Sequence, residues 1–135
     1  EAISQPLVGV RQHLRQAVTL LSDRDDPDYR NAIKESICAV ESLCMVITAD
    51  DGATLGQALN EIESTGEVEV HGALTAAFKS LYGYTSDSEG IRHALLQEDS
   101  LGHEDAKYMV VNCSAFVNYL IEKARKADIE LDDGS

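Results

Sequence analysis

Arg92 and His93 are the residues of this sequence whose types and position are best suited to chemistry, and they follow Gly90 in a segment rich in turn-forming residues. An arginine guanidinium is a planar fork that binds phosphate, and a histidine transfers protons near neutral pH. Together the two side chains can cleave RNA through its own 2′-hydroxyl. Arg92 would hold the scissile phosphate and His93 would serve as acid or base, so we take both as candidate catalytic residues.

Direct adjacency is an obstacle to this hypothesis, because neighbouring side chains on a helix diverge by about 100 degrees. Both can reach one phosphate at an irregular helix start, or in a symmetric dimer that brings two copies to one cleft. The structural alternative is that Arg92 pairs with Glu89 one turn back and His93 caps or packs. Both interpretations stay open at the level of the sequence.

The elements that position these residues are helices. Few stretches alternate between apolar and polar residues, and the 9 glycines and 2 prolines provide too few turns for a β-sandwich or barrel. Apolar residues instead recur at spacings of three and four. We predict an all-α, up-and-down bundle of four long helices plus one or two short ones. The expected helices cover about 6–22, 27–49, 54–66, 72–83, 91–96 and 104–127.

Polar residues and glycines predict where several helices begin and end. Asp26 is the expected N-cap of the second helix with Pro27 in its first turn, and Thr54 the expected N-cap of the third. Gly83 is expected to interrupt the fourth helix. His71 is expected to cap or pack at a helix start, and His13 to lie on the polar side of the first helix.

The chain is predicted to form one bundle over 1–128 with a disordered acidic tail over 129–135. It opens at Glu1 without a Met, so we expect a further domain to be missing. No apolar run reaches the roughly 20 residues that a membrane span needs. Histidines and cysteines lack metal-ligand spacing, so neither metal nor cofactor is predicted. Buried, reduced thiols are expected at Cys38, Cys44 and Cys113, which indicates the cytoplasm.

Charge argues against a nucleic-acid partner, because 24 acidic against 11 basic side chains leave a net charge of −13. Such a chain repels a phosphate backbone. The best basic cluster can converge if the first two helices pack antiparallel, although a solvated helix face also explains it; its members are Arg11, Arg15, Arg30 and Lys34. Tyr82 and Tyr84 can stack on bases, yet Tyr82 continues the core spacing of Phe78.

The last helix carries a wide apolar stripe, because Val110, Val117 and Ile121 add to its core positions. We therefore expect this helix to be central or to meet a partner chain, and we predict a homodimer through it.

Several segments resemble the C-terminal helical domain of abortive-infection proteins of the AbiJ type. They are DYRNAIKESI over 28–37, AVESLC over 39–44, LYGYTSD over 81–87, GIRHA over 90–94 and CSAFVNYL over 113–120. These domains look like members of the HEPN superfamily of helical bundles. The resemblance implies a prokaryotic antiviral defence protein, and many HEPN proteins cut RNA.

The superfamily signature is an Arg followed by a His after four to six intervening residues, and no Arg–His pair of this sequence has that spacing. Two hypotheses follow. The first is a metal-independent endoribonuclease or RNA-binding effector that acts as a dimer through Arg92 and His93. The second is a non-catalytic helical dimerisation or interaction module of a larger defence protein.

Overall fold

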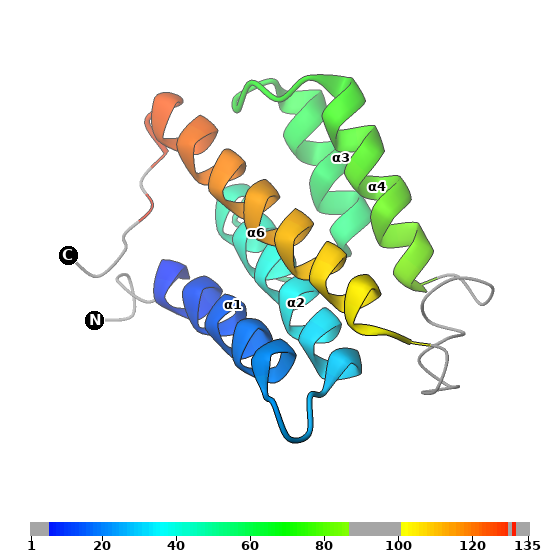
Figure 1. The fold of residues 1–135 in the computed structure, drawn as a ribbon. Coiled ribbons are helices and arrows are strands. Elements are labelled where there is room, and N and C mark those ends of the chain that lie inside the picture. Colours follow the sequence, from blue (N-terminus) through cyan, green and yellow to red (C-terminus); the bar gives the residue numbers. More distant parts are fainter. Residues whose placement is uncertain (1–5, 87–100, 130, 132–135) are drawn as a thin grey trace.

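The computed structural model describes residues 6–86, 101–129 and 131, and these residues form five α-helices and no strand. The helices are α1 (Pro6–Ser22), α2 (Tyr29–Thr48), α3 (Leu55–Thr65), α4 (Gly72–Ser86) and α6 (His103–Lys126). The all-α fold class is therefore confirmed. The helices run up and down in a bundle (Figure 1).

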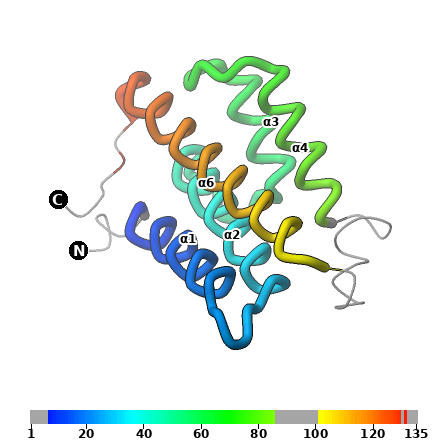
Figure 2. Tube along the Cα trace, in the orientation of Figure 1, coloured from blue at the N-terminus to red at the C-terminus, as the bar shows by residue number. Residues whose placement is uncertain are grey.

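α2 is the central helix, because it packs against α1, α3 and α6 (Figure 1). The α3–α4 hairpin lies on the opposite side of α6 from α1, so α6 runs between the two helical hairpins (Figure 2). α4 and α6 are antiparallel neighbours with little backbone contact between them. This arrangement leaves a seam between α4 and α6 that side chains must fill.

The core consists of the apolar positions that recur along the helices. Its largest fully buried side chains include Leu7, Ile33, Leu43, Leu59, Met109 and Leu120. The spacing of four and three predicted for α2 is observed: Ile33, Ile37, Val40 and Cys44 are all buried. Burial of each such aliphatic side chain contributes about 1.5–3 kcal/mol before chain entropy is subtracted.

The start of α2 differs from the prediction. Asp28, rather than Asp26, is the N-cap, and its carboxylate accepts the backbone N–H of Asn31 at 3.1 Å. Pro27 thus precedes the cap. The preceding turn is closed by Asp23, whose carboxylate accepts the N–H groups of Asp25 and Asp26 at 2.9 and 3.0 Å. These two hydrogen bonds lower the pKa of Asp23 and hold Asp26 outside the helix.

Two other predicted boundaries also change. α4 continues through Gly83 to Ser86, since a single glycine costs only about 1 kcal/mol in a helix interior. Beyond α6, Leu131 is only 8% exposed and belongs to the core cluster, with Ile129 packed against it. These two apolar residues are therefore not part of a free tail. Thr54 caps α3 and Gly66 ends it with a φ of +67°, both as predicted.

Candidate functional site

Arg92, His93 and Glu89 lie outside the described residues, as does the short helix expected over 91–96. The candidate catalytic pair therefore remains a prediction from the sequence. The described residues allow a test of the other predicted features, namely the basic cluster, the histidines, the cysteines and the partner-facing side of α6.

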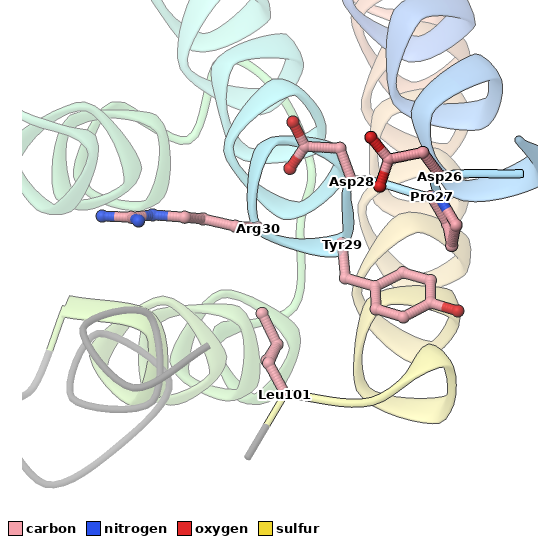
Figure 3. Close-up of a pocket in the computed structure, with 6 residues that line it drawn as sticks. All are labelled: Asp26, Pro27, Asp28, Tyr29, Arg30 and Leu101. Carbon is pink, nitrogen blue, oxygen red and sulfur yellow. The ribbon is translucent and has the colours of Figure 1, made fainter. Parts of the chain in front are cut away.

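The predicted basic cluster does not include Arg30. α1 and α2 pack antiparallel, yet the Arg30 side chain points away from α1 (Figure 3). It lines a hollow of about 290 Å³ together with Asp26, Pro27, Asp28, Tyr29 and Leu101. Two carboxylates against one guanidinium make this hollow a poor place for a phosphate. The Asp28 carboxylate, moreover, is already engaged as the cap of α2.

His13 joins α1 to α2, which the sequence analysis missed. Its Nδ1 lies 2.7 Å from the Glu35 Oε1, and both side chains are about one-third exposed. The helix register explains the pair. The N–H of Asp28 donates to the carbonyl of Leu20 at 3.0 Å, which fixes the two antiparallel helices side by side. His13 lies seven residues before Leu20 on α1, and Glu35 lies seven residues after Asp28 on α2, so the two side chains meet. Burial raises the pKa of the nearby Glu41, an effect that His13 partly opposes.

The cysteines are unsuited to nucleophilic chemistry. Cys44 and Cys113 are buried and free, as predicted, and burial raises their pKa values to about 12 and about 11. Cys38 is only half-buried, but burial and the charges of Glu41 and Glu35 also raise its pKa. All three thiols are therefore protonated at neutral pH. His71 caps α4, because its Nδ1 accepts the N–H of Ala73 at 3.0 Å.

An apolar groove of about 540 Å³ lies between α4 and α6, and it is the best candidate for a functional site among the described residues. α4 contributes Leu74, Ala77, Phe78, Ser80, Leu81 and Tyr84. α6 contributes Tyr108, Asn112, Ala115, Phe116 and Tyr119. None of these side chains is charged, although charged residues make up 26% of the chain.

Large side chains of this face stay in contact with solvent. Tyr108 is 59% exposed, Tyr84 46% and Leu74 44%, and Val111 beside them on α6 is 55% exposed. Contiguous exposed apolar surface of this kind marks interaction sites on folded proteins. Tyrosine adds a hydroxyl to a large ring, which is why it is common where proteins meet.

The floor of the groove is rigid. Phe78 of α4 stacks on Phe116 of α6 with ring centroids 4.3 Å apart and planes 5° from parallel. α4 is also tied to α3, since the Thr75 hydroxyl donates to Glu63 at 2.9 Å and Lys79 lies 3.7 Å from the same carboxylate. The groove therefore has a floor that is held in place by contacts among α3, α4 and α6.

α6 meets the core with one side and the groove with another. Val110, Val117 and Ile121 widen the apolar stripe that predicted a central helix or a partner contact, and all three are buried in the bundle. The residues available to a partner are Tyr108, Val111, Ala115 and Tyr119, which the periodicity did not single out. At the end of the groove, the Lys123 ammonium lies 5.7 Å from the centroid of the Tyr119 ring.

Comparison of the chain with models of protein families, with curated proteins and with solved structures finds no match. Within the described ranges, no three His, Cys, Asp or Glu side chains are grouped so that they can hold a metal ion. No helix of the described part combines the length and apolar character needed to cross a bilayer. The α4–α6 groove is therefore the feature of the described residues on which a proposal of function can be based.

Proposed function

We propose that this chain is an interaction module of a HEPN-like antiviral defence protein in the prokaryotic cytoplasm, and that it binds a helical partner in the α4–α6 groove. The observation that carries the proposal is an uncharged groove of about 540 Å³, with the exposed rings of Tyr84 and Tyr108 at one end and the exposed Leu74 beside the half-buried Tyr119 at the other. The defence context rests on the resemblance of the sequence to AbiJ-type domains. Three free thiols are compatible with a reducing compartment.

The shape and chemistry of the groove favour a helix as its occupant. Tyr84 and Tyr108 stand at one end and Leu74 and Tyr119 at the other, as the antiparallel course of α4 and α6 requires. Small or short side chains lie between these ends, among them Ala77, Ser80, Asn112 and Ala115. An amphipathic helix laid along such a trough buries its apolar face, with the aromatic residues as anchors.

RNA cleavage is the second candidate function. The adjacent Arg92 and His93 supply a phosphate-binding fork and a proton-transfer group, and the segment over 90–94 is part of the resemblance. The net charge of −13 and the absence of the superfamily's Arg–His spacing favour the interaction module over this alternative.

A phage-protection assay separates the two functions. Bacteria expressing the wild-type protein are expected to survive phage challenge. Tyr108→Ser removes an anchor that is 59% exposed, so protection should fall at least tenfold, measured as plating efficiency. Val18→Ser is the matched control, because Val18 is 49% exposed on α1, away from the groove, and protection should be retained.

His93→Ala is expected to retain protection, and the purified wild-type protein is expected to leave an RNA panel intact. Loss of protection in His93→Ala but not in Tyr108→Ser, together with RNA products ending in 2′,3′-cyclic phosphate, would instead establish RNA cleavage. A wild-type protein that gives no protection against any phage tested would overturn the defence context.

A further inference from the structure

The geometry of α6 points to a second copy of this chain as the occupant of the groove: we propose a two-fold symmetric dimer in which the two α6 helices pair antiparallel, with Tyr108 of each copy against Tyr119 of the other. This inference rests on the proposed function, because it names the partner that the groove binds.

The spacing of the groove residues on α6 is the first argument. Tyr108, Asn112, Ala115 and Tyr119 follow one another at intervals of four, three and four, a sequence of intervals that is the same in both directions. Alternation of four and three is the rhythm of helices that pair along their length. A two-fold axis midway between Asn112 and Ala115 then brings each of these positions opposite another member of the set.

Val111 adds one more exposed apolar side chain at the edge of this face. Val111 lies three residues after Tyr108, so the two copies of Val111 lie on the same side of the paired helices. Val111 is 55% exposed in the single chain and needs a partner to be buried. Ala115 near the axis is small, so the two helices can approach closely there.

Charge complementarity is the second argument. The first turn of α6 carries only acidic charges and its last turn only basic ones, namely Glu104 and Asp105 against Lys123, Arg125 and Lys126. Antiparallel pairing places the acidic end of each helix beside the basic end of the other. Glu104 lies four residues before Tyr108, and Lys123 four residues after Tyr119, so the register that pairs the tyrosines also brings these two oppositely charged residues to the same level along the helix pair. Parallel pairing would set like charges together.

The overall charge leaves this chain few surfaces on which it can meet a second copy. Two molecules that each carry −13 repel one another except where an uncharged face lets them meet. The groove is such a face, and its ends supply the attractive pairs. The α4 and α6 helices of the two copies would then form a four-helix bundle across the axis.

Disulfide mapping tests the register. Tyr108→Cys and Tyr119→Cys variants are oxidised separately and as an equimolar mixture, at a concentration where light scattering shows the wild-type chain to be dimeric. At a rise of about 1.5 Å per residue, the two thiols introduced at position 108 of an antiparallel dimer lie about 16 Å apart, too far for a disulfide. A cross-linked dimer is therefore expected only in the mixture. The wild-type chain controls for Cys38, Cys44 and Cys113.

Cross-linking of Tyr108→Cys with itself would show parallel pairing and overturn the inference, as would a mixture that does not cross-link. Failure of the dimer proposal can be told apart from failure of the proposed function. If phage protection depends on Tyr108 while the chain remains monomeric, the groove binds another partner, so the function stands and the second copy is wrong. If protection is indifferent to Tyr108, the groove has no role and both proposals fall.

Discussion

Ala115→Lys is expected to abolish self-association of the 135-residue chain while leaving its fold intact. Ala115 is exposed in the single chain, so a lysine there changes the free energy of unfolding by no more than about 0.5 kcal/mol. In the symmetric dimer the substitution would place two unpaired like charges near the two-fold axis, inside an apolar interface. That costs about 3 kcal/mol, which raises the dissociation constant roughly 100-fold. Sedimentation velocity over a concentration series measures this dissociation constant.

Ala76→Lys is the matched control, because Ala76 is exposed on α4 but does not line the groove. Both substitutions add one positive charge to a chain of net charge −13 and so weaken the repulsion between copies equally. Association should persist in Ala76→Lys. Equal loss in both variants, or no loss in either, would show that the groove is not the interface.

Leu43→Ala is expected to cause the largest loss of stability among single substitutions of this kind. Leu43 is fully buried on α2, the helix that packs against α1, α3 and α6. Its truncation removes apolar contacts and leaves a cavity between helices that cannot close, at a cost of about 3 kcal/mol. The midpoint of thermal unfolding should fall by about 10 °C. Circular dichroism in the far ultraviolet follows the transition.

Val18→Ala provides the comparison, since Val18 is 49% exposed on α1 and its truncation should change stability by less than about 0.5 kcal/mol. If Leu43→Ala costs as little as Val18→Ala, α2 is not the centre of the bundle.

Periodicity predicted the helices well because each turn of a bundle helix buries an apolar side chain on the same face. Ile33, Ile37, Val40 and Cys44 fall on one face of α2, and that regularity needs no knowledge of the neighbouring helices. Helix ends depend on single hydrogen bonds, so they were predicted less well. Asp26 and Asp28 are equally good N-caps by residue type. Asp23 accepts the N–H of Asp26 and keeps that residue in the turn, so Asp28 becomes the N-cap of α2.

The groove was not predicted, because its residues come from two helices whose packing the periodicity of each helix does not specify. Tyr84 and Tyr108 are distant in sequence and line one surface only because α4 and α6 pack antiparallel. The contact of His13 with Glu35 similarly follows from the α1–α2 register, which the sequence does not specify without the turn between them. The wide apolar stripe of α6 was interpreted as a sign of a central helix or of a partner contact, and the fold buries its residues, such as Val117, inside the bundle.

Hydroxyl-radical footprinting of the wild-type chain, below and above the concentration at which it associates, shows directly whether a second copy covers the groove. In a dimer formed through the groove, oxidation of Tyr108, which is 59% exposed in the single chain, falls several-fold in the concentrated sample, whereas oxidation of Val18 on α1 does not change. An associated chain in which Tyr108 remains as reactive as in the dilute one would rule out this dimer, and so would a chain that stays monomeric at millimolar concentration.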